Sequence, residues 1–207
     1  LSSLDESLVV NGKQFNLGIH CYGDVYEPRG HKYIVDFDMD PAPSITYKVG
    51  EVLFKKSFIL APDNDQVLVK YQLMEAPSKV TLMLKPFLAF RNIHSLTSQN
   101  SEADTEYENI DGGVSFCLYD GFPALNMQLS CKSSFRYMPY WYNGVTYSDE
   151  SRRGFACKED LFVPGHFVLE MKPGDTVVFS ASVSEANPKQ LKKKCTDTER
   201  KLRDVAD

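Results

Sequence analysis

Short β-prone runs follow one another along most of this sequence, and turn residues separate them. Asn11-Gly12 joins the first two runs, and Asn-Gly is the strongest local signal for a hairpin because both turn positions need positive φ. Residues 32–39 alternate apolar and polar side chains, which predicts a strand with one buried face. No helical period separates the runs before residue 187. The sequence therefore predicts an all-β fold, a large antiparallel β-sandwich rather than a βαβ fold.

The end of the chain differs in character and predicts a short helix. Asn187 can cap a helix, and Pro188 suits its first position. The apolar positions of this otherwise charged segment are Leu191, Cys195, Leu202, Val205 and Ala206. We expect a sandwich over residues 1–186 and a helical linker over 187–207, whose apolar positions need a partner surface outside this chain. The alternative is a frayed polar tail, because a short isolated helix is marginal in water.

The composition argues against several classes of protein. Lys and Arg number 23 against 28 Asp and Glu, and the net charge of −5 gives no basic surface for nucleic acid. No apolar run approaches the roughly 20 residues that span a bilayer, and no basic leader opens the chain. A membrane protein is therefore not expected. Because the first residue is Leu1 rather than Met, we expect a fragment of a longer protein.

The cysteines and histidines give no pattern typical of a metal site. The 5 cysteines are an odd number without a CxxC pair, so reduced thiols in a cytosolic protein are the simplest interpretation. The 4 histidines lie far apart without HExxH or HxH spacing, so we expect no metal and no cofactor. A glycosidase needs two carboxylates within about 10 Å of each other, which sequence spacing cannot show. No catalytic residue is predicted.

One apolar run ends in a cluster of polar side chains, Arg91, Asn92 and His94. Their guanidinium, amide and imidazole groups are of the kinds that bind hydroxyls or a carboxylate. We therefore predict that these three residues bind substrate. The alternative is that Arg91 and His94 anchor the long following loop through backbone carbonyls.

Aromatic side chains gather in a second stretch. They are Phe135, Tyr137, Tyr140, Trp141, Tyr142 and Tyr147. Aromatic faces with polar tips suit sugars, because sugar faces present C–H groups while sugar hydroxyls reach the polar tips. Pro139 and Asn143-Gly144 interrupt a regular strand, so we predict that Tyr140, Trp141 and Tyr142 lie in an exposed loop and bind sugar. The same spacing could also place these rings in the core.

Several stretches together carry a family resemblance. The two most specific are Glu27 to Tyr33, with the sequence Glu-Pro-Arg-Gly-His-Lys-Tyr, and Phe90 to Leu96, with the sequence Phe-Arg-Asn-Ile-His-Ser-Leu. The others are Leu1 to Glu6, Phe15 to His20, Arg153-Gly154, Glu159 to Gly165 and Phe179 to Ser182. Together these segments resemble the N-terminal domain of bacterial and archaeal glycogen debranching enzymes, the amylo-α-1,6-glucosidase type.

The resemblance implies a galactose-mutarotase-like supersandwich packed on a following (α/α)6 barrel, which holds the carboxylates that cleave α-1,6-glucosyl branches. This chain lacks the barrel, so the resemblance implies a non-catalytic domain in the cytoplasm. Its implied partners are α-glucan, as glycogen or maltooligosaccharide, and the barrel of the same protein. Arg91, Asn92 and His94 would face the barrel or its substrate entrance. Family members usually begin with a further stretch, so an exposed sheet edge is also expected.

Three functions remain open from the sequence. The first is an accessory domain that buttresses the barrel and positions glucan in glycogen catabolism. The second is an autonomous α-glucan-binding module that uses the aromatic patch around Trp141. The third is a free-standing sugar epimerase of the mutarotase type, with His and Glu as acid and base. The charged terminal helix favours the first function, because a standalone module has no need of it.

Overall fold

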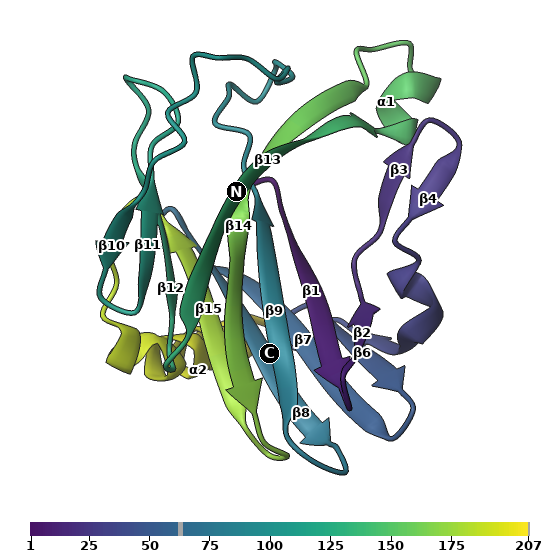
Figure 1. The fold of residues 1–207 in the computed structure, drawn as a ribbon. Coiled ribbons are helices and arrows are strands. Elements are labelled where there is room, and N and C mark those ends of the chain that lie inside the picture. The colour runs from purple at the N-terminus through teal and green to yellow at the C-terminus, as the bar shows by residue number, and fades with distance from the viewer. Residues whose placement is uncertain (62–63, 207) are drawn as a thin grey trace.

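Two antiparallel β-sheets face each other in the computed structural model, which describes residues 1–61 and 64–206 (Figure 1). The small sheet has the order β13 (Ser134–Thr146), β14 (Lys158–Met171), β9 (Val80–Phe87), β1 (Ser3–Val10), β2 (Lys13–Asn16). The large sheet has the order β10 (Glu108–Ile110), β11 (Gly113–Phe116), β12 (Leu125–Leu129), β15 (Thr176–Ser182), β8 (Gln66–Glu75), β7 (Val52–Ala61), β6 (Ser44–Val49), β5 (Ile34–Asp38). The predicted all-β antiparallel sandwich is confirmed.

Smaller elements complete the fold at one side of the small sheet. A separate hairpin of β3 (His20–Tyr22) and β4 (Val25–Glu27) stands beside β1, as Figure 1 shows, and the 3-10 turn η1 (Gly30–Tyr33) follows it. The short helix α1 (Ser148–Arg152) connects β13 to β14. The hairpin contacts β13 and packs His20 against Phe87 of the small sheet, whereas η1 contacts β6 of the large sheet.

The first hairpin forms as its turn residues predict. Asn11 and Gly12 have φ values of 49° and 75°, and they join β1 to β2. Positive φ at both positions is what a two-residue hairpin turn needs. The pairing that follows places Leu8 opposite Phe15. The predicted Asn-Gly hairpin is therefore confirmed.

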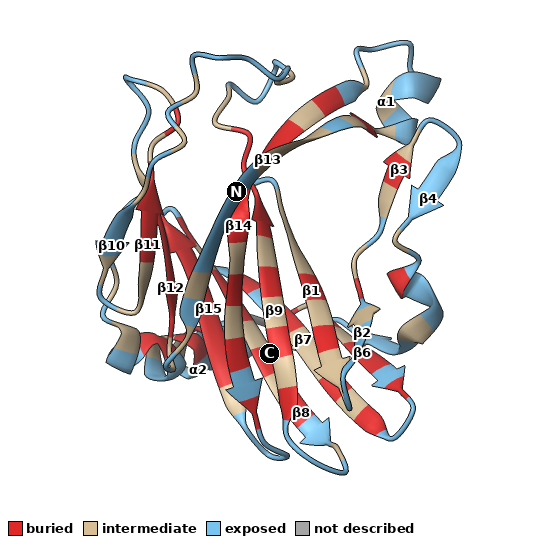
Figure 2. Ribbon diagram, in the orientation of Figure 1, coloured by how far each residue is buried: buried red, intermediate tan, exposed pale blue. Residues whose placement is uncertain are grey.

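The main core lies between the two sheets, where Figure 2 shows buried residues alternating along the strands. Leu8, Leu82 and Phe167 from the small sheet join Phe54 and Phe179 from the large sheet, and none of the five is more than 1% exposed. Burial of one such side chain contributes about 1.5–3 kcal/mol. Period-two alternation along each strand thus supplies the apolar face that holds the sheets together.

Part of the core-facing side of the large sheet is uncovered. Phe58 and Leu60 on β7 alternate with Ile59, which packs on the outer side of the sheet, so both point toward the side that carries the core. They are nevertheless 39% and 70% exposed. Phe37 on the edge strand β5 pairs with Ile45, which packs against the core, and is 59% exposed. Every residue of β5 is exposed, so the prediction of a buried face for residues 32–39 is wrong. The small sheet therefore does not cover this end of the large one.

The C-terminal helix begins where the sequence predicts. The Asn187 side chain accepts a hydrogen bond from the backbone N–H of Lys189 at 3.0 Å, which caps the turn η2 (Pro188–Gln190). The helix α2 (Leu191–Ala206) continues from it and lies across the outer side of the large sheet, in contact with β15 and β7 (Figure 1). The expected short terminal helix is confirmed.

The expectation that this helix needs a surface outside the chain is wrong. Leu191 and Cys195 are 1% exposed and form a second apolar cluster with Ile59, Leu68 and Val178 of the large sheet. Those three strand residues point away from the main core, so the outer side of the sheet carries its own apolar stripe. The helix packs on this stripe because its two apolar positions are one turn apart.

Candidate functional site

Arg91, in the polar cluster after β9, binds a buried carboxylate. Its Nη2 donates to Oε2 of Glu159 on β14 at 3.2 Å, its Nε donates to Oε1, and the Glu159 side chain is fully buried. Its Nη1 donates to the carbonyl oxygens of Asn92 and Ile93 at 3.2 and 3.3 Å. These contacts fit the alternative interpretation, in which Arg91 anchors the loop through backbone carbonyls.

Glu159 collects further donors from the segments around it. The backbone N–H of Thr97 donates to its Oε1 at 3.0 Å, and the Tyr147 hydroxyl donates to its Oε2. Burial alone would raise the pKa of Glu159, but the hydrogen bonds from Arg91, Tyr147 and Thr97 outweigh burial and lower that pKa. In return, the Glu159 carboxylate raises the pKa of Arg91. The charged pair therefore ties the loop after β9 to β14.

Asn92 and His94 are exposed and interact with each other locally. The Asn92 Oδ1 accepts the backbone N–H of His94 at 2.9 Å, an Asx-type turn. The donors of Arg91 and the amide oxygen of Asn92 are thus engaged within the protein, whereas the His94 imidazole reaches solvent. Substrate binding by these three residues stays a prediction.

The aromatic stretch lies in a strand, so the expected loop is wrong. Strand β13 continues through it, with register shifts between Tyr137 and Tyr140 and between Tyr142 and Val145. Pro139 lies within the first irregularity, and Asn143-Gly144 lie within the second. Bulges insert extra residues without ending the pairing, which explains how the strand accommodates these turn-prone residues.

Alternation along β13 separates the three predicted aromatic residues. Trp141 packs against the main core, with its ring 5.5 Å from that of Phe162. Tyr140 and Tyr142 pack against a different cluster on the outer side of the small sheet, which includes Phe87 at 4.8 Å from the Tyr142 ring. The two tyrosines are neighbours, with ring centroids 5.1 Å apart. The structure therefore brings together Tyr140 and Tyr142 and turns the Trp141 ring to the opposite side.

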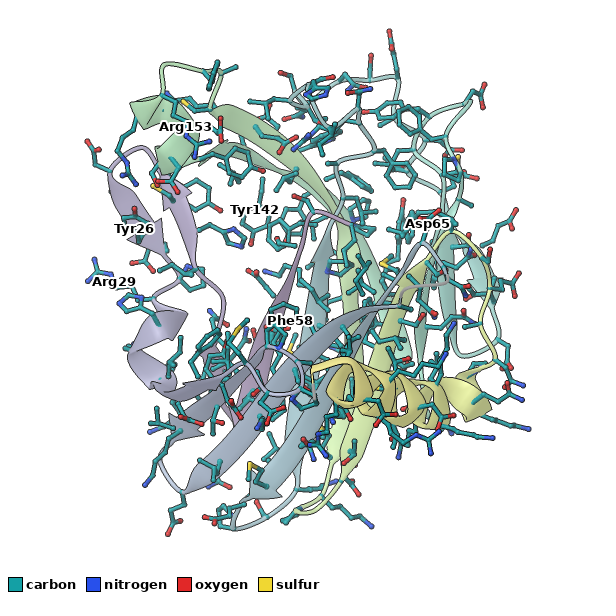
Figure 3. The ribbon with its side chains drawn as sticks, turned by 180° about the vertical axis from the view of Figure 1, so that it is seen from behind. Tyr26, Arg29, Phe58, Asp65, Tyr142 and Arg153 are labelled. Carbon is teal, nitrogen blue, oxygen red and sulfur yellow. The ribbon has the colours of Figure 1, made fainter. Side chains whose placement is uncertain are left out.

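A pocket of about 520 Å³ adjoins these tyrosines. Tyr22, Glu27 and Pro28 from the β3–β4 hairpin line one wall, and residues 140–143 of β13 line the other. Figure 3 shows Tyr142 between the small sheet and the hairpin. The volume lies in the range of about 300–1,000 Å³ that is typical of small-molecule sites. We call this feature the tyrosine pocket.

The hydroxyls of Tyr22 and Tyr140 in the pocket remain protonated at neutral pH. Burial, followed by the nearby Tyr142 and Asp5, raises the pKa of Tyr22 to about 12. Burial and the hydrogen bond with Tyr142 also raise the pKa of Tyr140. A neutral phenol donates one hydrogen bond and accepts others. The pocket therefore offers aromatic faces and hydroxyl groups, and the Tyr22 and Tyr140 hydroxyls do not act as bases near neutral pH.

Asp5 and His20 position the hairpin wall, and no local motif in the sequence predicted their pairing. The His20 Nε2 lies 2.9 and 2.8 Å from the two Asp5 carboxylate oxygens, and the His20 ring lies 4.7 Å from that of Phe87. A Cβ added to Gly18 would lie 2.7 Å from the Asp5 carboxylate, so glycine there leaves room for the carboxylate in its contact with His20. The only available signal was that both residues fall in segments of the family resemblance.

A family profile for the N-terminal region of glycogen debranching enzyme matches residues 1–178. The chain belongs to this family. The predicted resemblance to this N-terminal domain is thereby confirmed. No curated protein sequence matches the chain.

Solved structures show weaker similarity to this debranching-enzyme N-terminal domain. The heparan sulfate lyase HepC from Pedobacter heparinus is similar over 72% of this chain and 21% of its own, with 11% identity and a TM-score of 0.40. A polysaccharide lyase is similar over 96% of this chain and 27% of its own, with 11% identity and a TM-score of 0.35. The chain thus spans between 21% and 27% of the length of these two proteins.

Two other kinds of site are not found in the part of the chain that the structure describes. Within residues 1–61 and 64–206, no group of His, Cys, Asp and Glu side chains is placed to hold a metal ion. No helix in these ranges has the length and apolar character to cross a membrane. The tyrosine pocket and its Asp5–His20 support are therefore the candidate site that we develop below.

Proposed function

We propose that this chain is the non-catalytic N-terminal domain of a glycogen debranching enzyme, and that it positions α-glucan for, and buttresses, an (α/α)6 catalytic barrel of the same protein. The observation that carries the proposal is the family match over residues 1–178. The substrate, glycogen or a maltooligosaccharide, follows from the family description. The α-1,6-glucosidase activity would then belong to the barrel and not to this chain.

The tyrosine pocket supports a glucan-positioning role. Tyr140 and Tyr142 present neighbouring rings, and their hydroxyl oxygens lie 3.4 Å apart. Flat sugar faces pack against aromatic rings, and neutral phenols exchange hydrogen bonds with sugar hydroxyls. The pocket is open along the outer side of the small sheet, so a glucan chain could leave it toward another domain.

Exposed apolar side chains support a buttressing role. Ile93 is 83% exposed and Phe155 is 63% exposed, and both lie in loops beyond the ends of the small-sheet strands. Apolar groups of this kind in a soluble domain often mark surfaces that contact another protein surface. We propose that this loop-bearing end meets the barrel. The linker role of α2 belongs to the same proposal, with the residues beyond its sheet contact leading toward the barrel.

A cytoplasmic location completes the proposal. All 5 cysteines are free thiols, as expected in a reducing compartment. Two of them, Cys21 and Cys195, are buried. Glycogen is the substrate that the family description names, and its turnover would require the domain to share a compartment with that polymer.

Native affinity electrophoresis in gels with and without glycogen tests the glucan role directly. We expect glycogen to retard the chain, and Tyr142→Ala to reduce the retardation because it removes a ring of the pocket. Tyr26→Ala is the matched control, because Tyr26 is 46% exposed and lies on the same hairpin region without lining the pocket. Equal retardation of all three proteins would reject the pocket as the glucan site.

The other two functions predict different results. An autonomous module would bind glycogen as tightly alone as when joined to the barrel, whereas a positioning domain should bind more weakly alone. When the domain is joined to the barrel, a glucan chain bound by the barrel has a raised effective concentration at the domain. A positioning domain should therefore bind glucan more tightly when joined to the barrel than alone. An epimerase would interconvert the anomers or epimers of a free sugar, and polarimetry with glucose would detect this. Such turnover by the isolated chain would contradict the proposal.

A further inference from the structure

A row of basic side chains crosses the outer side of the small sheet. Arg136 pairs with His166 across β13 and β14, and Phe167 pairs with Leu84 across β14 and β9. Phe167 and Leu84 belong to the core, so the adjacent residues His166 and Lys85 point to the outer side. Arg136, His166 and Lys85 therefore lie on neighbouring strands of one face. We call these three residues the basic row.

The basic row lacks acidic partners. Neither Arg136 nor Lys85 forms an ion pair within the described residues, although the ion pairs of several other basic residues are well defined. The His166 Nε2 atom is buried and has no hydrogen-bond partner among the described residues. Burial and the charges of Arg136 and Lys85 lower the pKa of His166, which is consistent with the closeness of the three groups.

The nearest carboxylate along the row is already engaged. Asp5 pairs with Lys85 across β1 and β9, but both of its oxygens contact the His20 Nε2, at 2.9 and 2.8 Å. The Lys85 ammonium instead donates one hydrogen bond, to the Tyr142 hydroxyl at 3.0 Å. An ammonium carries three donors, so two remain for a ligand. Arg136 and Lys85 are like charges on either side of His166, and a bound anion would relieve their repulsion.

The row also adjoins the tyrosine pocket. Lys85 lies 5.2 Å above the centre of the Tyr142 ring, and Tyr142 lines the pocket. A ligand that rests on the tyrosines would therefore place a substituent next to the Lys85 ammonium. Arginine and lysine donors suit phosphate and carboxylate groups. The basic row and the tyrosine pocket thus meet at one place on the sheet.

We propose that the basic row binds the anionic group of a saccharide whose ring lies on Tyr140 and Tyr142. The inference rests on the proposed function for the sugar part and adds the class of ligand, a sugar that carries a phosphate ester or a carboxylate. A phosphorylated glucan unit is one source of such a group, and a uronic acid is another. The row selects for charge, whereas the tyrosines select for the sugar.

Isothermal titration calorimetry of the 207-residue chain at low ionic strength tests this inference with defined probes. The probes are glucose 6-phosphate, glucuronate, glucose and inorganic phosphate. We expect at least one charged sugar to bind about 10-fold more tightly than both glucose and inorganic phosphate, because hydrogen bonds to charged groups are worth that factor or more. The stronger of the two charged sugars identifies whether the group is a phosphate ester or a carboxylate.

Two variants and one control assign the effect to the row. Lys85→Gln and Arg136→Gln should each weaken the binding of the charged sugar by about 10-fold and leave the affinity for glucose unchanged. Arg136 is exposed, so its variant should fold even if the part-buried Lys85 variant does not. Lys79→Gln is the matched control, because Lys79 already pairs with Glu170 at 2.7 Å. It should bind every probe as the parent does.

Three results would overturn the inference. If charged sugars bind no more tightly than glucose, the proposed anion site is rejected. The glucan role would still be supported if glycogen retardation depends on Tyr142. Inorganic phosphate that binds as tightly as glucose 6-phosphate would leave a plain anion site with no link to sugar. Equal losses in the Lys79→Gln control would show general charge attraction. Loss of glycogen retardation with intact binding of charged sugars would instead reject only the glucan role.

Discussion

The Nε2 atom of His20 lies within 2.9 Å of both carboxylate oxygens of Asp5, and this contact fixes the β3–β4 hairpin on the small sheet. The two residues are 15 positions apart in the chain. Their side chains are 9% and 14% exposed, so the pair lies mostly out of water. This contact therefore holds one wall of the tyrosine pocket to β1, and a hydrogen bond from the Gly23 backbone N–H to the Thr146 Oγ1 at 2.9 Å holds the same hairpin to β13.

Replacing Asp5 should loosen this wall. Asp5→Ala leaves the His20 Nε2 without its partner, and we expect the free energy of unfolding to fall by about 1–3 kcal/mol. Urea denaturation would measure the change, and limited proteolysis should show faster cleavage in the hairpin. Asp24→Ala is the control, because Asp24 is an exposed acid in the same hairpin. Equal stability of the Asp5 and Asp24 variants would contradict the assigned role.

The Arg91–Glu159 pair should contribute more to stability than exposed pairs do. Arg91→Ala leaves the fully buried Glu159 side chain without its guanidinium, at a cost of about 2–4 kcal/mol in the free energy of unfolding. Arg153→Ala removes an arginine whose pair with Glu150 is exposed, and should cost less than about 0.5 kcal/mol. Thermal or urea unfolding of the two variants checks the contrast. A similar small loss in both would show that Arg91 does not anchor the loop.

The same pair predicts how stability depends on pH. The folded protein lowers the pKa of Glu159, so this carboxylate stabilises the fold above its ordinary pKa. That contribution should be lost as the pH falls through the lowered value. Urea unfolding of the parent and of Glu159→Gln, compared between pH 7 and acid, should show a steeper loss in the parent. Parallel curves would indicate that another group controls the acid sensitivity.

The helix α2 should stabilise the domain through its buried face. Leu191→Ala opens a cavity between the helix and the large sheet, and we expect a loss of about 2–4 kcal/mol. Leu202→Ala is the matched control on the same helix, because Leu202 is 36% exposed. Circular dichroism melts would compare them. A linker that only connects to another domain would make both substitutions nearly neutral.

The Trp141 ring should report on core packing and not on the pocket. Because it packs 5.5 Å from Phe162 in the main core, Trp141→Ala should lower the free energy of unfolding by about 2–3 kcal/mol. Glycogen retardation by the folded Trp141→Phe variant should match that of the parent. If Trp141→Phe lost its retardation by glycogen at unchanged stability, the Trp141 ring would belong to the glucan-binding site.

Local signals predicted the elements that depend on neighbouring residues. The Asn11-Gly12 turn and the Asn187 cap follow from short-range conformational preferences, and both are confirmed. The alternation over residues 32–39 predicted a strand but not its exposure, because burial depends on whether the other sheet reaches that edge. The predicted aromatic loop is wrong because bulges let β13 continue past Pro139. A bulge depends on the partner strand, which the sequence around Pro139 does not specify.

The sequence by itself determined the strands, their turns, the terminal helix and membership of the debranching-enzyme N-terminal family. The tertiary structure decided which of these strands are neighbours and in which register they pair. Packing of the separate β3–β4 hairpin brought His20 to Asp5. Register aligned Arg136, His166 and Lys85, and alternation along β13 points the Tyr142 ring away from the Trp141 ring. The two-residue period of a strand means that its side chains alternate between the two faces of the sheet. Which of those faces is buried depends on pairing between strands that are distant in the chain.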